Sequence, residues 1–519
     1  MANLSRCLLV LLVGFSHSYP TTTLPTYPRA TIASGEIIGT TTQLSSVPTA
    51  VANKFLGIPF AKSPPQRFSL PEDVRPWTSP LMATEFKPSC IQQFTFEFLR
   101  NIENNPPLPE SEDCLYLNVF VPASPPPPGG RPVMFWIYGG AFQFGSARLD
   151  MYDGSALAVN GDVVVVTANY RMNVFGFPTS PVIPLEQRNV GLYDQRKALA
   201  WASQNIHAFG GNPAEVTIFG ESVGGHSVKQ LVANPPKPLP FNAAILQSQS
   251  KGIPGTDVDS WPVLAEELGC NSTSGDISQL DCIRAASVEQ IRGIIDTQSL
   301  TFSPTVDNKT NFGRVENILR SPTAAHVPIL IGSNADEGTM LSQTVHNSQL
   351  LLAQIFGNDT VAQKKALSLY PSNLTDPELR TKIFTDGLYT CVTSALAQSF
   401  AESGHPTWRY FFNASFPNTQ PFPGAGAWHT SEIYEVFGTY PRDNKTTDQQ
   451  VVLSRFIQHA WTNFAKRPTT GPGWEKVRAS SGVVEVLGMD GRWGGIAVPQ
   501  DEVDRVCEVY NAAIWRSGL

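Results

Sequence analysis

One serine stands between two glycines at a spacing that suits nucleophilic chemistry. Gly220, Ser222 and Gly224 form a G-x-S-x-G motif, and the apolar run at 216–219 leads directly into it. A strand, this motif and a following helix are typical of a nucleophile elbow, a sharp turn that exposes the serine hydroxyl above a sheet. Glycine-sized neighbours are needed because the strand and the helix pack closely around the turn. Ser222 is therefore a candidate nucleophile.

A serine hydroxyl is a poor nucleophile at its own pKa, so it needs a base, and the base needs an acid that fixes its tautomer. In folds with this elbow the chain order is serine, then Asp or Glu, then histidine. Spacing alone does not select the base among the histidines that follow the elbow and its helix, which are His326, His346, His405, His429 and His459.

The elements that must position these residues are short apolar runs without alternation. Strands that are buried on both faces have this composition. Helical stretches lie between them, and the one at 191–211 repeats its apolar residues at helical spacing before a Gly-Gly stop. This pattern predicts an α/β fold in which helices cover a mostly parallel sheet. The runs are 133–138, 163–168, 216–219, 243–246, 327–332 and 408–412.

The first residues predict a secretory leader. Arg6 precedes an apolar stretch from Cys7 to Phe15, and Ser16 and Ser18 suit peptidase cleavage. The stretch is too short to cross a bilayer, and no other run reaches the roughly 18 apolar residues of a membrane helix. We expect residues 1–18 to be a signal peptide and the protein to be secreted, without a transmembrane segment.

The rest of the chain, 19–519, is expected to form a single domain. The Thr- and Pro-rich segment that runs to about residue 50 predicts an extended or weakly ordered arm. The proline-rich run at 124–130 is interpreted as a turn because strand-like runs stand on both sides of it.

The composition of the chain limits the kinds of partner that we expect it to bind. The chain of 519 residues has a formal net charge of −7, 16% charged residues and no Lys/Arg-rich block. These features argue against nucleic-acid binding and favour a small neutral partner. No C-x-x-C pair or His-rich spacing is present, so we expect no metal and no other cofactor.

Cysteines and sequons agree with export. Apart from Cys7 the cysteines form an even set of six, which allows 15 pairings. Asn-x-Ser/Thr sequons are potential glycan acceptors in an exported protein. They lie at Asn271, Asn308, Asn358, Asn373, Asn413 and Asn444.

Six longer sequence motifs indicate a relationship to a known protein family. The runs "FLGIPFA" (55–61), "EDCLYLNVFVP" (112–122), "FWIYGGAFQFGS" (135–146), "NYRMNVFGF" (169–177), "NVGLYDQRKALAW" (189–201) and "NIHAFGGNPAEVTIFGESVGG" (205–225) occur in one order. In these motifs the chain resembles the type-B carboxylesterase/lipase family, which includes cholinesterases and fungal lipases, from about residue 30 to 510. The resemblance implies an α/β-hydrolase fold and a serine esterase.

The resemblance also implies roles for single residues. It gives Ser222 as nucleophile, Glu337 as acid and His429 as base. Asp336 competes with Glu337, but the family's acid stands directly before the glycine of this motif, so Asp336 is expected to serve a loop or cap. Glu221 is expected to be a buried carboxylate that orients the elbow.

The oxyanion hole implied by the resemblance consists of the backbone N–H groups of Gly140, Ala141 and Val223. Many family members have glycine in place of Ala141 and alanine in place of Val223. Both substitutions leave the N–H donor intact and narrow the space around the acyl group. Each donor is worth about 3–4 kcal/mol of transition-state stabilisation.

The resemblance further implies structural pairs. Arg67 with Glu112 and Arg171 with Asp194 match positions that form internal ion pairs in the family. The implied disulfides are Cys90–Cys114, Cys270–Cys282 and Cys391–Cys507.

The loop between Cys90 and Cys114 bears on the substrate. In lipases of this family it is a mobile lid, and in cholinesterases it carries an aromatic residue, usually Trp, that holds a quaternary ammonium. This loop has no Trp, which counts against choline esters. Its phenylalanines Phe94, Phe96 and Phe98, which lie close to Leu99 in the sequence, either line a gorge for medium acyl chains or belong to the core.

We therefore expect a carboxylester hydrolase for moderately apolar esters, with a small-molecule or lipid ester as its substrate. A true triacylglycerol lipase is the alternative within the same chemistry. A catalytically silent adhesion or storage relative is the alternative from another class, and the intact Ser222, Glu337 and His429 argue against it.

Overall fold

The structure is a computed structural model that describes residues 27–44, 47–104, 106–249, 260–270, 277–478 and 482–517. The predicted leader and the sequon at Asn271 lie outside these residues, and so does part of the segment between 249 and 277. Among the described residues, no helix is long and apolar enough to cross a bilayer.

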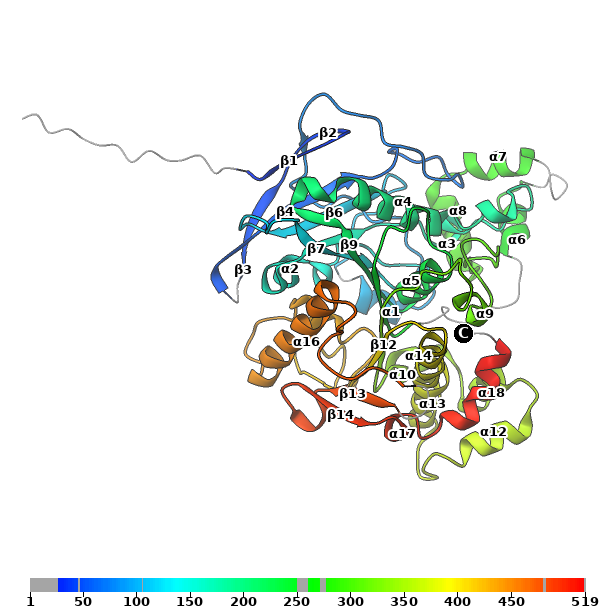
Figure 1. The fold of residues 1–519 in the computed structure, drawn as a ribbon. Coiled ribbons are helices and arrows are strands. Elements are labelled where there is room, and N and C mark those ends of the chain that lie inside the picture. Colours follow the sequence, from blue (N-terminus) through cyan, green and yellow to red (C-terminus); the bar gives the residue numbers. More distant parts are fainter. Residues whose placement is uncertain are drawn as a thin grey trace, which may run out of the picture.

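A large twisted sheet forms the centre of the molecule (Figure 1). One group of neighbouring strands is parallel throughout: β8, β7, β9, β10, β11, β12 and β13. Antiparallel strands flank this group at both edges. In order across this 11-stranded sheet they are β14 (Gly495–Pro499), β13 (Val483–Leu487), β12 (Thr407–Phe412), β11 (Ile329–Asn334), β10 (Ala243–Gln247), β9 (Gly211–Glu221), β7 (Arg131–Ile137), β8 (Val164–Ala168), β6 (Tyr116–Pro122), β4 (Val47–Pro59) and β3 (Thr40–Leu44).

The apolar runs predicted as strands are all strands of this sheet. In β8 and β10 every residue is buried, as expected for strands with helices on both faces. The run at 124–130 connects β6 to β7, which confirms the predicted turn. The mostly parallel sheet with flanking helices confirms the expected α/β-hydrolase fold.

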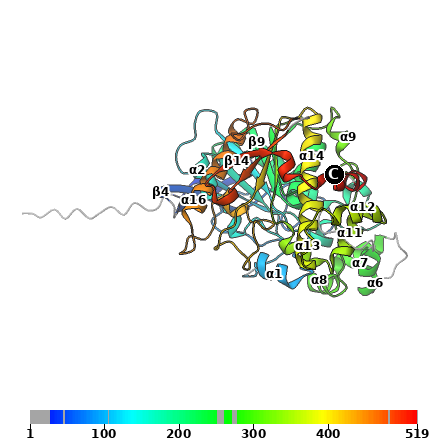
Figure 2. The ribbon, with the colours of Figure 1, turned by 90° about the horizontal axis from the view of Figure 1, so that it is seen from below.

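Helices cover the sheet from two sides (Figures 1 and 2). On one side α2 (Ser155–Gly161) packs against α16 (Asp448–Lys466) so closely that a Cβ on Gly161 would lie 2.2 Å from the Thr462 side chain. The other side holds α4 (Val190–Asn205), α5 (Val223–Ala233) and α14 (Cys391–Glu402).

The remaining helices lie in the connections, mostly beyond the carboxyl ends of the strands. They are α1 (Glu97–Glu103), α3 (Asn173–Gly176), α6 (Ser260–Glu267), α7 (Ile277–Ala285), α8 (Val288–Thr297), α9 (Glu316–Leu319), α10 (Gly338–Leu341), α11 (Ser348–Phe356), α12 (Thr360–Leu367), α13 (Asp376–Thr385), α15 (Ile433–Phe437), α17 (Gln500–Val503) and α18 (Cys507–Ser517).

The expectation of a weakly ordered arm is wrong for the part of that segment that the structure describes. Residues 29–44 form β1 (Arg29–Ile32), β2 (Gly35–Ile38) and β3, and β1 and β2 join β5 (Leu81–Met82) in a small sheet. The threonines are β-branched and favour strands, and the few apolar residues between them, such as Ile32 and Ile37, are buried. The Thr-rich composition concealed the alternation of exposed and buried residues, which is seen in β1.

The helix at 191–211 ends earlier than its Gly-Gly stop predicts. α4 ends at Asn205, and a 3₁₀ turn (Ile206–Phe209) follows it. Gly210 then adopts a φ of 79°, the left-handed conformation that ends helical structure, and Gly211 already belongs to β9.

The cysteines pair as the resemblance implies. Cys90 binds Cys114, Cys270 binds Cys282, and Cys391 binds Cys507. The last bridge joins α14 to α18 and closes 116 positions of sequence. In the loop-entropy model a bridge of this span destabilises the unfolded chain by about 4–5 kcal/mol.

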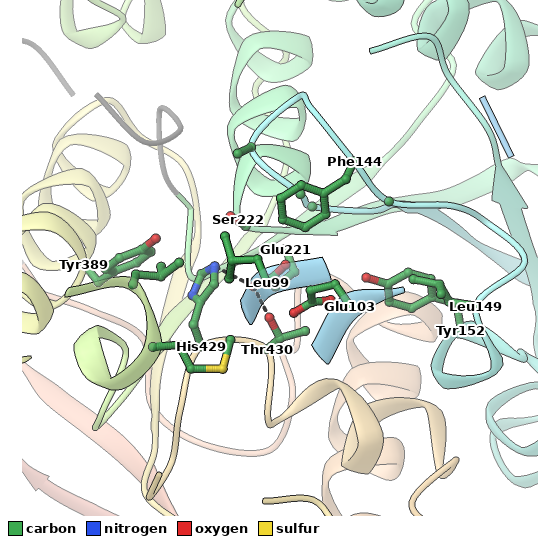
Figure 3. Close-up of a pocket in the computed structure, with 16 residues that line it drawn as sticks. Leu99, Glu103, Phe144, Leu149, Tyr152, Glu221, Ser222, Tyr389, His429 and Thr430 are labelled. Carbon is green, nitrogen blue, oxygen red and sulfur yellow. Dashed lines mark hydrogen bonds and ion pairs between the residues drawn. The ribbon is translucent and has the colours of Figure 1, made fainter. Parts of the chain in front are cut away.

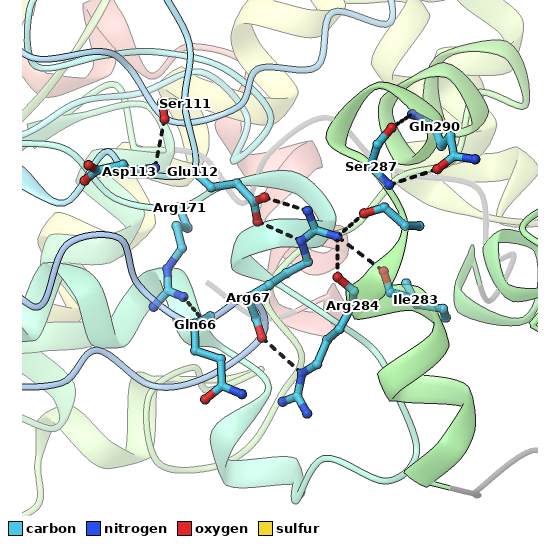
Figure 4. A network of polar contacts seen from close by, with 11 residues as sticks. Gln66, Arg67, Ser111, Glu112, Asp113, Arg171, Ile283, Arg284, Ser287 and Gln290 are labelled. Atoms are coloured by element: carbon cyan, nitrogen blue, oxygen red, sulfur yellow. Dashed lines mark hydrogen bonds and ion pairs between the residues drawn. The ribbon is translucent and has the colours of Figure 1, made fainter.

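The two expected ion pairs also form, and each ties distant segments together. Arg67 binds Glu112 through two hydrogen bonds of 2.7 and 2.5 Å, and its Nη1 donates to the carbonyls of Ile283, Arg284 and Ala286 at the end of α7 (Figure 4). Arg67 thus fixes the loop closed by Cys90 and Cys114 to the segment between α7 and α8.

Arg171 and Asp194 form the more deeply buried pair. Arg171 Nε and Nη2 donate to the two carboxylate oxygens at 2.8 and 2.7 Å, and its backbone N–H donates to Oδ2 at 3.1 Å. The side chains are 4% and 0% exposed. The pair holds the segment after β8 against α4, which packs on the sheet beside the elbow.

Replacing Arg171 by Met should therefore destabilise the protein strongly. Asp194 would remain as a buried charge without its partner, which costs about 3–5 kcal/mol. Arg320→Met is the matched control because Arg320 and Glu402 form an ion pair that is 61% and 43% exposed, and surface pairs contribute at most about 1 kcal/mol. Urea unfolding followed by tryptophan fluorescence measures both, and equal losses would contradict a structural role for the buried pair.

Candidate active site

Ser222 stands on a strained turn at the carboxyl end of β9. Its φ and ψ are 57° and −124°, a conformation that side-chain-bearing residues rarely adopt and that costs about 1–3 kcal/mol. It is the N-cap residue of α5, and its N–H donates to the Gln247 carbonyl of β10 at 2.9 Å. The strain is maintained because the sheet and the helix both fix the turn.

Glycine at position 224 is required by the close packing of this turn. A Cβ there would lie 2.0 Å from the carbonyl oxygen of Ile137, the last residue of β7. Any side chain would push α5 away from the sheet and displace Ser222. Steric packing therefore explains why the second glycine of the motif is needed.

A pocket of about 610 Å³ opens in front of Ser222 (Figure 3). Most of its wall is apolar, and its polar groups gather around Ser222 and His429. It is lined by Leu99, Glu103, Gly139, Gly140, Ala141, Phe144, Gly145, Leu149, Tyr152, Glu221, Ser222, Met340, Leu341, Tyr389, His429 and Thr430.

The backbone beside Ser222 presents free N–H donors. Gly140 and Ala141, which line the pocket, have φ values of 101° and 55°. This left-handed run follows β7, and the Gly140 carbonyl closes the turn by accepting from Gln143 and Phe144. Among the described residues, none accepts a hydrogen bond from the N–H of Gly140, Ala141 or Val223. The three donors can therefore bind an oxyanion next to the serine.

His429 and Glu337 meet beside this pocket. His429 Nδ1 lies 2.5 Å from Glu337 Oε2, and the Asn334 N–H donates to Glu337 Oε1 at 2.7 Å. Both side chains are buried. Asn334 also donates to the Trp428 carbonyl at 2.9 Å, so the end of β11 holds the acid and the histidine loop in one arrangement.

Asp336 has the loop role that was expected of it. Its Oδ2 accepts the Ala427 N–H at 2.9 Å, two residues before His429. Asp336 does not contact the imidazole among the described interactions.

The other candidate histidines lie elsewhere. His326, His346 and His459 are exposed, and His405 is buried with Nδ1 3.0 Å from the Val327 carbonyl. None of them lines the pocket. Among the candidate histidines His429 is the one that lines the pocket with Ser222, so its position makes it the candidate for the base.

Glu221 differs from its expected role. It is 2% exposed, as predicted, but its carboxylate faces the catalytic machinery, with Oε1 3.0 Å from His429 Nε2. In the part of the chain that the structure describes, Ser222 Oγ forms no hydrogen bond with Nε2. The imidazole thus lies between two carboxylates, and Nε2 must exchange Glu221 for the serine before it can act as a base. Hydrogen bonds at catalytic groups often tighten only with substrate bound.

Burial and charge set the protonation of this cluster. Burial disfavours a charged imidazole, but the carboxylates of Glu221 and Glu337 outweigh it and raise the pKa of His429 to about 9. Burial also raises the pKa of Glu221 well above its usual range, and His429 opposes that rise only in part. Burial, together with the charge of Glu337, raises the pKa of Glu432 behind them to about 7.

Glu337 and Glu221 differ in their partners. The Glu337 carboxylate accepts the backbone N–H of Asn334 and pairs with Nδ1 of the imidazole. The Glu221 carboxylate pairs with Nε2 of the same imidazole.

The loop closed by Cys90 and Cys114 forms one wall of the pocket. Leu99 on α1 lines it, whereas Phe94 packs behind Phe144 with ring centroids 4.7 Å apart. Phe96 and Phe98 are partly buried against the same cluster. None of the loop's three phenylalanines lines the pocket, so they belong to the apolar cluster behind it, and Leu99 is the residue of this group that lines it.

Several pocket residues were not found from the sequence, among them Glu103, Tyr152 and Tyr389. Tyr152 comes from a 3₁₀ turn, Glu103 from α1 and Tyr389 from the π-helical turn 386–390, where its ring centroid lies 4.9 Å from that of His429. The only available signal was the position of Glu103 in the disulfide-closed loop and of Tyr389 two residues before Cys391.

A mostly parallel sheet that presents a serine turn, a histidine and an acid at its carboxyl edge defines the α/β-hydrolase class. A profile of the carboxylesterase family matches residues 26–487. The chain belongs to this family, and it is a carboxylester hydrolase.

Comparison with individual related proteins supports the same family assignment. The para-nitrobenzyl esterase of Bacillus subtilis (strain 168) is 36% identical over 462 residues, which are 84% of this chain and 91% of that protein. The acetylcholinesterase of Bungarus fasciatus is 33% identical over 79% of this chain and 74% of its own length. Carboxylesterase 1E of Mus musculus is 30% identical over 93% of this chain and 94% of its own length.

Glu337→Gln should reduce kcat far more than Asp336→Asn. The amide presents the wrong hydrogen-bonding partner to His429 Nδ1, and a comparable change in an Asp-based triad costs about 10⁴-fold. Asp336→Asn changes the same formal charge but touches only the loop N–H of Ala427. Turnover of one soluble ester by both variants measures the difference, and a larger loss for Asp336→Asn would reassign the acid.

Glu221→Gln should move the pH profile. A base must be neutral, so kcat/KM rises with pH through the pKa of His429, which is raised to about 9. Without the carboxylate at Nε2 this pKa falls, and the rise should occur at least about one pH unit lower. Glu435→Gln is the control, because Glu435 is equally buried but binds Gln450 at 3.0 Å and not His429. Identical profiles for both variants would show that Glu221 does not charge the imidazole.

Proposed function

We propose that the chain is a secreted serine carboxylesterase that cleaves moderately apolar esters through an acyl-enzyme intermediate. The observation that supports this most directly is the position of His429, which pairs with Glu337 through Nδ1 and turns Nε2 toward the pocket that Ser222 and the free N–H groups share.

In the first half-reaction Ser222 Oγ attacks the ester carbonyl carbon, and His429 Nε2 takes the hydroxyl proton. Glu337 orients the imidazole and stabilises its charged form. The N–H groups of Gly140, Ala141 and Val223 bind the oxyanion, which is the largest single contribution in this class of chemistry. His429 then protonates the leaving alcohol, and the acyl group remains on Ser222.

In the second half-reaction a water molecule takes the place of the alcohol. His429 accepts its proton while the hydroxyl oxygen attacks the acyl carbon. The same oxyanion donors stabilise the second tetrahedral intermediate, and collapse returns the acid and the free Ser222.

The pocket supports a moderately apolar ester. The space in front of Ser222, about 610 Å³ including the part that is open to solvent, is lined mainly by apolar side chains. Leu99, Phe144 and Leu149 offer apolar contact to an acyl or alkyl chain, while the narrowing residue Ala141 adds a methyl group at the oxyanion hole.

A true triacylglycerol lipase is the second candidate. The observation that favours it is the pair Phe96 and Phe98 on the loop closed by Cys90 and Cys114, which are only partly buried and so present apolar surface to a lipid. Hydrolysis of short and long p-nitrophenyl esters, compared with emulsified triglyceride, separates the two. Faster turnover of the emulsion than of the soluble esters would favour the lipase.

The proposal of secretion rests on the leader sequence and is supported by the three disulfides. The sequon asparagines among the described residues are all exposed, so a glycosyltransferase can reach them; they are Asn308, Asn358, Asn373, Asn413 and Asn444. Mass spectrometry of the secreted protein before and after glycosidase treatment tests both points.

Ser222→Ala and His429→Ala should each abolish ester hydrolysis, and the double variant should lose little more than either. The residues of a triad act as one unit, so their losses are not additive. Steady-state kinetics on p-nitrophenyl butyrate, with a check of folding by circular dichroism, measures this. A burst of product from Ser222→Ala, or additive losses, would contradict the proposed chemistry.

A further inference from the structure

Glu103 is a charged side chain in a position where the reaction does not need one. It is the last residue of α1, and it lines the same pocket as Ser222. In Figure 3 its carboxylate lies near Thr430 and Tyr152, on the side of His429 where Glu221 lies. No step of ester cleavage uses this carboxylate.

Among the described residues, none forms an ion pair or a hydrogen bond with Glu103. The ionisable groups that face it are His429, Glu221 of β9, Tyr152 of the turn 150–152 and Tyr434 of α15. The nearest cation on its own helix, Arg100, instead lies over the Phe94 ring at 5.5 Å. The pocket therefore contains two carboxylates without a lysine or arginine to balance them.

Glu103 is partly buried. The loss of surrounding water raises the pKa of its carboxyl from 4.5 to about 7, and the charge of His429 lowers it only in part. A ligand that supplied a cation would remove this penalty, since a carboxylate with little water around it is stabilised by an opposite charge with hydrogen bonds.

The backbone around Glu103 is fixed before any ligand binds. The Asn104 N–H donates to the Arg100 carbonyl at 2.9 Å, and the Asn104 side chain accepts from the Leu108 N–H at 3.0 Å. The Cys90–Cys114 bridge closes the loop, and Leu99 anchors α1 in the apolar cluster. A fixed carboxylate loses little entropy on binding, which favours selectivity.

The alcohol portion of the ester is the part that would meet Glu103. His429 gives its proton to the leaving alcohol, so the alcohol lies on the side of Nε2. Glu103 and Glu221 are on that side, and His429 is the charged group that acts most on Glu103.

We propose that Glu103 is a specificity-determining residue that binds a primary ammonium group on the alcohol portion of the ester. A primary ammonium group offers both charge and N–H donors, which suits a carboxylate in an otherwise apolar wall. A quaternary ammonium has no donor and is held by aromatic faces. This inference rests on the proposed ester cleavage at Ser222.

The test compares n-hexyl acetate with 5-aminopentyl acetate, in which an ammonium group replaces the terminal methyl group. The measured quantity is the ratio of kcat/KM for the amine to that for the alkyl ester at pH 8. We expect a ratio above one for the parent enzyme. Glu103→Gln should lower the ratio by roughly 10- to 100-fold, the value of one charge-assisted hydrogen bond.

Glu97→Gln is the matched control. Glu97 lies on the same helix and carries the same charge, but it is exposed, so the ratio should not change. An equal fall in both variants would mean that the net charge of the loop attracts the amine, which would overturn the proposal. Equal losses for both substrates in Glu103→Gln would mean that Glu103 acts through His429, with the same consequence.

Two further substrates test whether the ammonium group must donate a hydrogen bond and whether it must lie on the alcohol portion of the ester. The 5-(trimethylammonio)pentyl ester should lose most of the advantage because it cannot donate, and a hexyl ester with the amine on its acyl chain should show none. Full advantage in either compound would overturn the hydrogen bond or the placement on the alcohol side. Activity on n-hexyl acetate with a ratio that Glu103→Gln leaves unchanged would refute this inference alone, whereas inactivity on all the esters would refute the proposed function itself.

The pH dependence gives an independent readout. Only the carboxylate form of Glu103 pairs with the amine, so the ratio should rise with pH through about 7, where Glu103 loses its proton. The charges of His429 and Glu221 also act on the amine, but they are present in the parent enzyme and in Glu103→Gln alike, so the comparison of the two enzymes isolates the contribution of Glu103. In Glu103→Gln the rise should disappear, and a rise that persists would assign it to another group and overturn the proposal.

Discussion

The close approach between the Ser222 turn and the end of β7 is the constraint on which the site depends. The space beside Gly224 is filled by the Ile137 carbonyl, so β7, β9 and α5 can meet only with glycine there. The parallel register pairs Ile137 with Gly220, which places the ends of the two strands side by side. The residues that continue from those ends, Gly140 with Ala141 on one side and Val223 on the other, therefore present their N–H groups to one point. The sheet thus positions these N–H groups, because none of them donates a hydrogen bond to another group among the described residues.

A second consequence of this packing is electrostatic. The site lies at the edge of a buried sheet, so its carboxylates are removed from water, and burial raises the pKa of both Glu221 and Glu432. Glu337 differs in its contacts, because a backbone N–H and the imidazole both bind it. The same low-dielectric surroundings favour the protonated form of Glu221 beside the histidine. A neutral Glu221 leaves His429 Nε2 available to the serine, whereas a charged Glu221 retains it.

Much of the fold could be predicted from the sequence because the central strands are buried on both faces. Runs such as 163–168 contain no polar residue that a solvent-facing strand would need, except one threonine that is also buried. The N-terminal strands β1 to β3 were missed because their signal is weak. They are short, and their threonines resemble an unstructured tract when composition alone is considered.

The site was predictable where chemistry depends on local sequence and unpredictable where it depends on side-chain direction. The elbow is a local motif, so Ser222 followed from spacing. The choice of His429 and Glu337 needed the resemblance, since five histidines have the right chain order. Glu221 was assigned to the elbow because it is adjacent to Ser222 in sequence, but a residue in a strand points to the opposite face from its neighbour, and Glu221 turns toward the imidazole.

The disulfide-closed loop explains why Glu103 escaped sequence reasoning and why it matters for the character of the pocket. An isolated glutamate in a polar stretch normally faces water, and only the attachment of the loop at both ends turns this one inward. Gln92 exchanges two hydrogen bonds of 2.9 and 2.7 Å with the backbone of Gly145, and Asn173 donates to the Ile91 carbonyl at 2.7 Å. These contacts join the start of the loop to the oxyanion segment, while Arg67 holds its other end through Glu112. The wall that carries Leu99 and Glu103 is thereby fixed to the same backbone that binds the oxyanion. A substrate that is positioned by this wall is positioned relative to Ser222 as well, so the loop converts contacts on the remote part of an ester into alignment of its carbonyl group.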